Sequence, residues 1–218
     1  MPRQPRPPGR RSYDQYCAAA RALDAVGDRW TLLIVRELLG GPRRYTDLHA
    51  DLPGVSTDML ATRLKDMERD ALVERRRLPA PASASVYELT ARGRRLLPVL
   101  QALEEWGAPA LADRRPTDAV RAHWFALPLR RALTGLGSTG VVDVRLDEGE
   151  FHVRVGADEP YAVYGDGCAP EEPDARLVLD TGTCVAVGRG DLTLEEAVRA
   201  GRVEVMGEGE LAKVLRGA

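Results

Sequence analysis

The residues of this 218-residue chain that could do chemistry are few, and those of the metal-binding kind stand far apart. None of the three histidines, His49, His123 and His152, has a cysteine, a second histidine or a carboxylate at a metal-ligand spacing. We expect each to be a surface or packing residue. The glycine-rich run 135–140 follows a predicted helix and precedes a predicted strand, the reverse of the order in a phosphate-binding loop. We therefore expect no metal ion, no cofactor and no catalytic centre, and an enzyme is the least favoured function class.

Cys17 is the thiol in the most suggestive position. A reactive cysteine needs solvent access and a lowered pKa, and Arg21, one helical turn further on, could lower the pKa of this thiol. The alternative, which the sequence favours, is that Cys17 is a small buried residue of the first helix. Three cysteines are too few for a disulfide framework, which predicts a reducing, cytoplasmic environment.

The composition is that of an ordinary globular protein, with 44% hydrophobic and 29% charged residues. No run of 18 apolar residues is present, so we expect no membrane span. The arginines near the N-terminus are not followed by an apolar stretch, so a signal peptide is not expected either.

The net charge of −2 is divided unevenly along the chain. Residues 1–115 carry 20 basic and 15 acidic side chains, whereas residues 116–218 carry 11 and 18. A basic half joined to an acidic half indicates two tasks, with nucleic acid as the candidate partner of the basic half. Solvated surface on both halves is the alternative explanation.

The first half shows the element order of a winged helix-turn-helix. Apolar residues at helical spacing predict four helices, the last of them capped by Ser56. The period then changes from 3.6 to 2, which predicts a hairpin, and a long helix kinked at Pro98 follows. The expected ranges are 17–26, 30–38, 45–52 and 57–71 for the four helices, 72–78 and 86–89 for the strands, and 90–107 for the long helix. In such a fold the fourth helix enters the major groove and the hairpin reaches the flanking backbone.

The residues expected to contact DNA lie on the elements that would face it. They are the basic pair before the third helix, the cap and outer face of the fourth helix, and the arginines of the first wing strand. By residue they are Arg43, Arg44, Ser56, Thr57, Asp58, Thr62, Arg63, Lys65, Arg75, Arg76 and Arg77. Asp58 is the weak member of this set, because a carboxylate repels phosphate unless it accepts from a cytosine amino group.

The second half has a different pattern and predicts a second domain. The expected elements are helices over 118–133, 192–198 and 210–215, a hairpin of strands 141–146 and 150–155, and strands over 175–180 and 201–208. Its aromatic residues Trp124, Phe125, Tyr161 and Tyr164 combine apolar area with polar groups. They are candidates for the wall of a ligand pocket, and their alternative role is to fill the core.

Several motifs recur in order over residues 13–107. They are GDRWTLLI at 27–34, REL at 36–38, GPRRY at 41–45, LPGVS at 52–56, LVER at 72–75 and YELT at 87–90, with Cys17, Leu23, Leu60 and Arg63-Leu64 among them. In these motifs the chain resembles the HxlR-type transcriptional regulators. The resemblance implies a dimeric bacterial DNA-binding protein that acts on promoters. It also places Cys17 where some members carry a redox-sensing cysteine that forms an intersubunit disulfide.

Two positions depart from the pattern of that family. Asp28-Arg29 stands where the family usually has a single lysine before the tryptophan, and the wing tip is rich in alanine. These departures bear on the wing contacts rather than on the fold.

Residues 175–215 resemble the C-terminal part of sterol-carrier-protein-like domains. The shared features are the strand before Asp180, the LTLEEA helix that begins at Leu192 and the GRVEVMGEG strand that begins at Gly201. The resemblance implies a sheet with helices on one face, often with an apolar tunnel between them, and it does not imply that sterol is the ligand.

We therefore expect an α+β protein with a disordered basic arm (1–12), a winged helix-turn-helix that is mostly α with a β-hairpin wing (13–107), a linker (108–116) and an α/β sterol-carrier-like domain that binds a ligand or supports a dimer (117–218). The predicted function is a cytoplasmic, homodimeric regulator of transcription that binds double-stranded promoter DNA and is controlled by a small apolar effector. Two alternatives stay open. One is a thiol-based redox switch at Cys17, and the other is a lipid carrier that uses its helical half only for dimerisation.

Overall fold

The computed structural model describes residues 12–79, 84–112, 114–156 and 162–217. The expected basic arm lies outside these residues except for Ser12, and most of the expected wing tip lies outside them as well.

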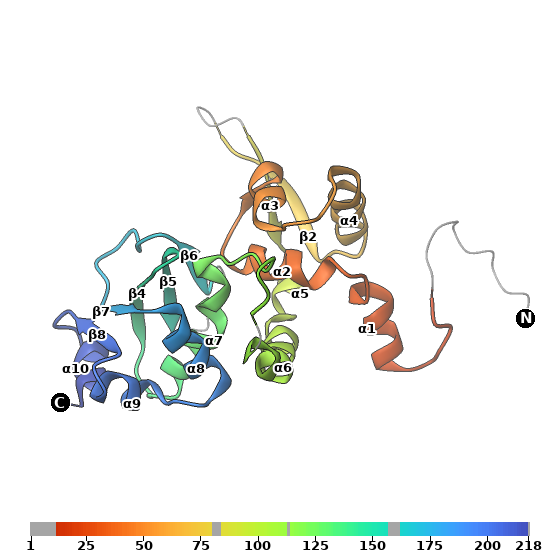
Figure 1. Cartoon of the computed structure of the whole chain (residues 1–218). Helices are drawn as coiled ribbons and strands as arrows, with labels where there is room; N and C mark the ends of the chain where they lie inside the picture. Colours follow the sequence, from red (N-terminus) through yellow and green to blue (C-terminus); the bar gives the residue numbers. More distant parts are fainter. Residues whose placement is uncertain (1–11, 80–83, 113, 157–161, 218) are drawn as a thin grey trace, which may run out of the picture.

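The N-terminal unit consists of helices with a small sheet at one end (Figure 1). Its elements are α1 (Ala18–Val26), α2 (Thr31–Leu39), β1 (Arg43–Arg44), α3 (Tyr45–Asp51), α4 (Thr57–Arg69), β2 (Val73–Arg77), β3 (Ser85–Leu89), α5 (Ala91–Arg94), α6 (Leu97–Gly107) and the 3-10 helix η1 (Ala108–Ala112). The sheet has the order β1-β3-β2 and is antiparallel, with Arg75 opposite Tyr87. The winged helix-turn-helix predicted from the sequence is therefore present.

α4 begins at the residue that the cap predicts. The Ser56 hydroxyl accepts a hydrogen bond from the backbone N–H of Met59, at 3.2 Å. Leu60, Leu64 and Met67 are each at most 1% exposed and join the core formed with α2 and α3. Burial of this stripe fixes the helix from behind and leaves its opposite face to solvent.

The prediction of one long helix over 90–107 is wrong in one respect, because this segment forms two helices. α5 ends at Arg94, and α6 starts at Leu97 with Pro98 in its first turn. A proline in the first turn lacks only an N–H that has no helical partner there, so it starts a helix without cost rather than kinking one. The expected linker also contains regular structure, since η1 occupies its first five residues.

The C-terminal unit is built on a five-stranded sheet. Its elements are η2 (Ala122–Phe125), α7 (Ala126–Thr134), β4 (Gly140–Leu146), β5 (Gly149–Val155), β6 (Tyr164–Asp166), β7 (Ala175–Leu179), α8 (Thr181–Arg189), α9 (Leu194–Arg199), β8 (Val203–Met206) and α10 (Glu210–Arg216). The strand order is β6-β5-β4-β7-β8, with β4 and β7 parallel and the other neighbours antiparallel.

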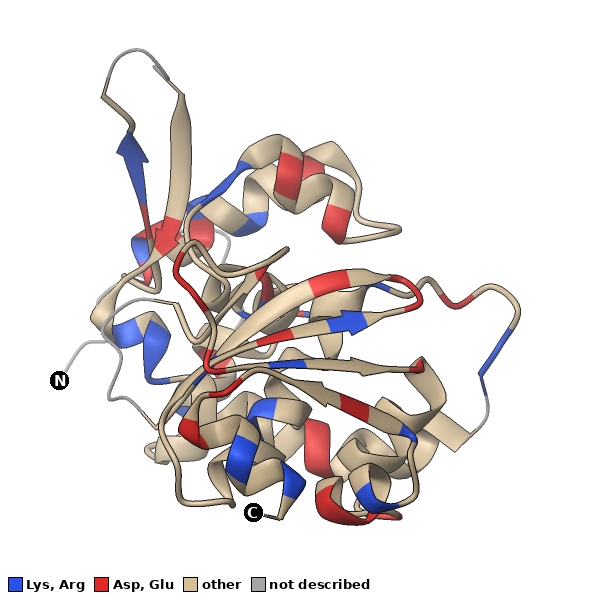
Figure 2. Ribbon diagram, turned by 90° about the vertical axis from the view of Figure 1, so that its left-hand side faces the viewer, with Lys and Arg blue, Asp and Glu red and all other residues tan. Residues whose placement is uncertain are grey.

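One face of this sheet is apolar and buried, whereas the other carries polar residues, of which Asp143 and His152 are buried and others are exposed. Val142, Val144 and Leu177 are at most 1% exposed, whereas Arg145 and Arg176, at alternate positions on the same strands, are exposed. Helices α7 to α10 lie on the side of the buried face (Figure 2). The alternation of apolar and polar residues therefore places all the helices of this unit in one layer.

Three elements of the C-terminal unit differ from expectation. The helix expected over 118–133 begins only at Ala122, as a 3-10 turn that continues into α7. The structure also has β6 and α8, which the sequence pattern does not predict. The run TGTCVAVGR of α8 is rich in glycine and β-branched residues, which lowers its helix propensity. The cap at Asp180, whose carboxylate accepts from the Thr183 N–H at 2.8 Å, is the signal that could have indicated this helix.

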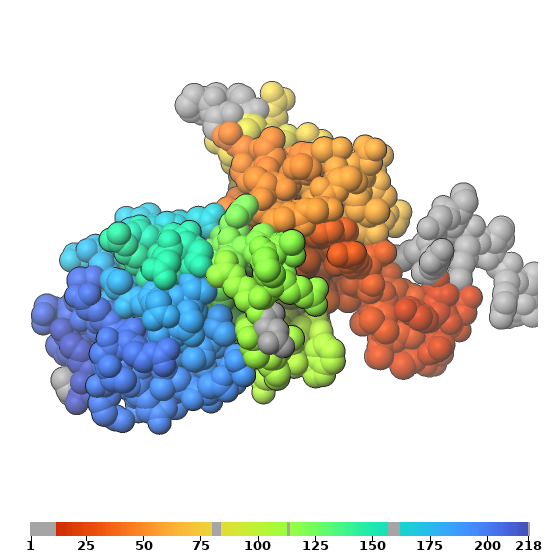
Figure 3. Space-filling model, viewed as in Figure 1, coloured from red at the N-terminus to blue at the C-terminus, as the bar shows by residue number. Residues whose placement is uncertain are grey.

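The buried apolar residues of the two units form one continuous core that runs from Val26 to Leu215. Figure 3 shows the green segment that contains α6 and η1 between the orange N-terminal helices and the blue C-terminal ones, while α1, in red, projects from the body. None of the described helices has the length and apolar character that crossing a membrane requires.

Candidate DNA-binding surface and interdomain site

The outer face of α4 is open and polar. All the predicted contacts on this helix and its cap other than Arg63 are exposed, namely Ser56, Thr57, Asp58, Thr62 and Lys65. The start of the helix is held by α3, because the Tyr45 hydroxyl donates to the Thr57 carbonyl at 2.7 Å. The helix therefore presents hydroxyls, a carboxylate and an ammonium group on a rigid support, as reading of the major groove requires.

Four of the predicted basic contacts are exposed and have no acidic partner among the described residues: Arg44, Lys65, Arg75 and Arg77. They lie on β1, α4 and β2 of the N-terminal unit. Charges that are not already paired are available to phosphate groups. α4 and the wing thus each offer cations that phosphate groups could contact.

Two further predicted contacts are held by acidic neighbours. The Nε of Arg76 lies 2.7 Å from an oxygen of Glu88 on the adjacent strand. Arg63 forms ion pairs with Asp28 and Asp66, and its side chain is only 13% exposed. DNA would have to compete with these carboxylates, so the expected direct phosphate contact of Arg63 is the weaker part of the prediction.

Cys17 is exposed, which contradicts the buried position favoured from the sequence. It precedes the first turn of α1, and the backbone N–H groups of Ala20 and Ala19 lower the pKa of its thiol. Arg21, the residue expected to do so, lies 3.7 Å from Asp24 instead. An accessible thiol at a helix N-terminus is the environment that favours thiolate chemistry.

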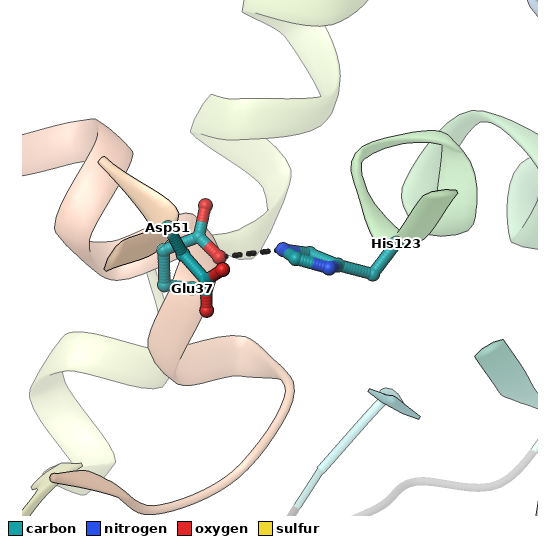
Figure 4. A group of neighbouring side chains, drawn as sticks. All are labelled: Glu37, Asp51 and His123. Atoms are coloured by element: carbon teal, nitrogen blue, oxygen red, sulfur yellow. Dashed lines mark hydrogen bonds and ion pairs between the residues drawn. The ribbon is translucent and has the colours of Figure 1, made fainter. Parts of the chain in front are cut away.

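A polar cluster joins the two units away from the DNA-facing surface. It consists of Arg36, Glu37, Arg43, Asp51, His123, Trp124, Tyr164 and Asp166. At its centre Glu37, on α2, is fully buried, and one of its oxygens lies 2.7 Å from the Nε2 of His123 (Figure 4). The other oxygen accepts from the Trp124 indole N–H at 3.1 Å and from Arg36 at 2.6 Å. Every oxygen of this buried carboxylate therefore has a partner.

The second ring nitrogen of His123 continues the cluster. Its Nδ1 lies 3.1 Å from Asp166, which also bonds Arg43. An imidazole that carries both protons can donate to both carboxylates. Arg43 lies 3.9 Å from Asp51 as well, so this arginine belongs to the interface between the units. DNA would have to compete with these carboxylates for Arg43, and the expected contact of this residue with DNA stays a prediction.

Tyr164 packs where the backbone of α2 ends. Its hydroxyl donates to the Arg36 carbonyl at 2.7 Å, and its ring lies so close to Gly40 that a Cβ there would be 2.6 Å from it. Tyr164 is 1% exposed, so it fills the core between the units and does not line a ligand pocket, contrary to the expectation. Tyr161 lies outside the described residues.

The pKa shifts in the cluster follow from its pairing. Burial on its own would raise the pKa of Glu37, but the hydrogen bond to His123 and the charge of Arg36 outweigh it and hold the pKa below its ordinary value. The pKa of Asp166 is lowered in the same way, against its burial, by the hydrogen bond from Arg43. The pKa of Asp51 is shifted the other way, because burial and the negative charge of Glu37 raise it. The cluster therefore favours the ionised form of Glu37 and Asp166 but not of Asp51.

Glu37, Asp51 and His123 are also the kind of group that binds a metal ion. Their ligand atoms all lie within 4.8 Å of one another. However, Arg36 already occupies one oxygen of Glu37, and Arg121 lies 3.7 Å from Asp51. A metal ion would have to displace cations that are in place, so the donor set fits an ion-pair network better than a metal centre.

A cavity of about 790 Å³ lies beside the cluster, between the two units. Its walls come from α2, α6 and η1 on one side and from η2, α7 and α8 on the other. Trp124 and Phe125 line it, as predicted for a pocket wall. The pocket was expected between helix and sheet within the C-terminal unit, and its position between the units is a correction.

The sequence predicts a surface or packing role for His123, and no motif in it connects His123 to Glu37. The two residues are 86 positions apart, and no local spacing relates them. Glu37 is the residue that could have indicated this contact. It is a carboxylate on the buried face of α2, and a buried carboxylate requires a hydrogen-bond or ionic partner from elsewhere in the chain.

Comparison with known proteins gives consistent results for the N-terminal unit. The family model of the HxlR-like helix-turn-helix matches residues 25–114. The HTH-type transcriptional regulator YodB of Bacillus subtilis is 38% identical over 85 residues, which cover 39% of this chain and 76% of that protein. An HTH-type transcriptional regulator of Synechocystis is 37% identical over 92 residues, covering 42% of this chain and 68% of its own. The solved structure of reduced YodB is 35% identical, covers 43% of this chain and 92% of that one, and gives a TM-score of 0.39. The family match ends before η2, so the C-terminal unit lies beyond it.

Proposed function

Since this chain belongs to the HxlR-like helix-turn-helix family and is a transcriptional regulator, we propose that it acts as a homodimer on promoter DNA and that a small molecule controls its affinity for that DNA. The observation that carries the DNA-binding part is the outer face of α4, whose polar residues are exposed, together with the wing arginines Arg75 and Arg77, which have no acidic partner among the described residues. We further propose that the C-terminal unit is the controlling domain. This proposal is supported by its five-stranded sheet with helices on one face, the arrangement expected from the resemblance to sterol-carrier-like domains.

The dimer is supported by an apolar stripe that the described part of the chain leaves exposed. Val99, Leu103 and Trp106 on α6 are 42%, 44% and 84% exposed, and their spacing places them on one side of the helix. Leu23 on the projecting α1 is 49% exposed. A two-fold interface between these helices would cover both and would set the two copies of α4 about 34–36 Å apart, one turn of DNA.

The dimer proposal is tested by charge insertion. Trp106→Glu should convert the dimer to a monomer in sedimentation, because a carboxylate would be buried without a partner. Met206→Glu, on β8, is the control, since Met206 is exposed to a similar degree as Leu103 and lies in the C-terminal unit. A dimer that survives Trp106→Glu with unchanged affinity would remove α6 from the interface.

The DNA-binding surface is tested with the two lysines of the chain, Lys65 and Lys213. Lys65→Ala should weaken binding to duplexes selected from a random pool, as measured by fluorescence anisotropy, whereas Lys213→Ala on α10 should not. The double variant Arg75→Ala/Arg77→Ala should reduce the log–log salt slope by about 1.8, because each phosphate contact contributes about 0.9. Equal effects of the two lysine variants would contradict the surface, and the absence of any DNA shift would favour the lipid-carrier alternative.

A second candidate control is a thiol switch at Cys17. It is favoured by the exposed position and lowered pKa of this thiol. Mass spectrometry of mildly oxidised protein should then find a Cys17–Cys17 link, and Cys17→Ser should make DNA binding insensitive to oxidant. Cys168→Ser is the matched control, because Cys168 is also exposed but its pKa is raised by its hydrogen bond to Glu150.

A further inference from the structure

We propose that the cavity between the two units is the effector site, and that its ligand is an amphipathic organic anion with a flat apolar body and one acidic group. This inference rests on the proposed function, because it names the class of molecule that would control DNA binding. It is supported by the shape of the cavity, by the charge of its wall and by its connection to α6.

The walls of the cavity suit a flat apolar molecule. Trp30, Trp124 and Phe125 contribute aromatic rings, and Leu33 and Val120 contribute aliphatic side chains. A volume of about 790 Å³ lies in the range of pockets that enclose a small organic ligand. Because both units contribute walls, a bound molecule would contact both.

The charged groups of the wall are not balanced. Four arginines line the cavity, and two of them are already engaged: Arg36 by Glu37, and Arg131 by Glu105 at 3.2 Å. Arg29 and Arg114 have no acidic partner among the described residues. Arg29 lies over the face of the Trp30 ring, 5.5 Å from its centre, so a cation stands directly beside an apolar surface.

The acidic groups of the wall oppose this charge only in part. Asp51 is already close to Arg121, which offsets its charge. Asp118 accepts a hydrogen bond from the Arg115 backbone N–H at 2.9 Å and keeps its negative charge, which offsets one of the two unpaired arginines. Burial raises the pKa of Glu104 to about 7, so this residue carries only part of a negative charge at neutral pH. The remaining charge of the wall is positive, which is complementary to a carboxylate or a sulfonate and not to an amine.

The cavity is connected to the proposed dimer interface through α6. Gln101 and Glu104 line the cavity, whereas Leu103 and Trp106 of the same helix are the exposed apolar residues. A ligand placed against the inner face of α6 would therefore act on the helix that sets the spacing of the two DNA-binding helices. Linkage then requires that DNA and ligand change each other's affinity by the same factor.

The experiment uses the full chain and two fluorescent probes that share one apolar scaffold. The anion is 8-anilinonaphthalene-1-sulfonate, and its neutral counterpart is N-phenyl-1-naphthylamine. We expect saturable binding of one anion per chain, at least tenfold tighter than binding of the neutral probe. Arg29→Gln and Arg114→Gln should each weaken binding of the anion several-fold without affecting the neutral probe, and Arg199→Gln, on α9, is the control.

Leu111→Trp tests the location, because Leu111 lines the cavity from η1 and is 52% exposed, so a larger side chain there disturbs the core little. This variant should weaken both probes with an unchanged unfolding transition. Equal affinity for the two probes would overturn the anionic class, and unchanged binding to Leu111→Trp would overturn the site.

DNA affinity is measured in parallel without probe. Intact DNA binding with no probe bound overturns this inference alone, whereas loss of DNA binding in the unmodified chain overturns the proposed function. When the anionic probe saturates the chain, the affinity for DNA should change at least fivefold. An unchanged affinity for DNA would show that binding of an anion in the cavity does not control DNA binding.

Discussion

The DNA-facing surface and the polar cluster use the same types of side chain under opposite conditions. On the surface, Lys65, Arg75 and Arg77 are exposed and have no carboxylate partner among the described residues. In the cluster, Glu37 is fully buried, and both of its oxygens are occupied. A charge removed from water must be paired in fixed geometry, whereas a charge left in water can exchange partners. The first condition suits a permanent joint between two units, and the second suits a reversible contact with DNA.

The strongest way to test this contrast is to break one pair in each region. His123→Ala removes a partner of a buried carboxylate and should lower the free energy of unfolding by about 3 kcal/mol. Arg76→Ala breaks the exposed pair with Glu88 and should lower the free energy of unfolding far less, because water and salt screen an exposed ion pair. Urea titrations followed by circular dichroism measure both. Similar losses for the two variants would show that burial does not distinguish the regions.

A second test concerns the pH dependence of stability at the cavity. Because burial raises the pKa of Glu104 to about 7, the folded chain holds this proton more tightly than the unfolded chain does. Its contribution to stability is complete below the unfolded pKa of 4.5 and is lost as the pH rises through about 7. Glu104→Gln should therefore be more stable than the unmodified chain at pH 8, by about 2 kcal/mol after allowance for solvent screening.

The same variant provides its own control at lower pH. At pH 4, below the unfolded pKa of 4.5, the two chains should unfold at nearly the same urea concentration, since Glu104 is then mostly protonated in both the folded and the unfolded chain. The two chains are compared by the difference between their free energies of unfolding. The contributions of Glu37 and Asp166 cancel in this difference; their lowered pKa values stabilise both chains, and this stability is lost as the pH falls. A constant difference from pH 4 to pH 8 would mean that Glu104 is not the group that titrates.

The smallest expected effect concerns the ion pair between Arg76 and Glu88 on the wing. Glu88→Gln removes the carboxylate that holds Arg76 and also removes a negative charge from the wing. DNA affinity should rise about two- to fivefold at low salt, and the salt slope should steepen by up to about 0.9. Glu204→Gln, an exposed residue on β8, is the matched control. An unchanged slope for Glu88→Gln would indicate that Arg76 does not reach phosphate even when it is released.

Much of the fold follows from local pattern. The stripe of Leu60, Leu64 and Met67, the cap at Ser56 and the strand alternation of the wing predict the DNA-binding elements, because each signal lies within a few residues of the structure that it forms. The hairpin of β4 and β5 is predicted for the same reason. α8 is not, since its glycines and β-branched residues are held helical by tertiary packing and by a cap.

The site is less predictable than the fold. The charge of Arg43 and its position before a helix indicated DNA, but its partner Asp166 is 123 residues away. The concentration of aromatic residues in the C-terminal unit predicts a cavity within that unit, yet about half of the residues that line the cavity come from the N-terminal unit. Contacts between distant segments depend on how complete units dock, and short sequence patterns carry no information about that.

The position of Glu37 also has a consequence for the order in which the chain is made and folded. Its partner His123 is 86 residues further on, and the Tyr164 hydroxyl that fixes the end of α2 is 128 residues beyond the carbonyl that it bonds. During synthesis the helices of the N-terminal unit emerge first and can form their local contacts while Glu37 is still hydrated. We therefore expect the DNA-binding fold to exist for a time with its inner side open, and α2 to become fully protected from hydrogen exchange only after β6 has left the ribosome.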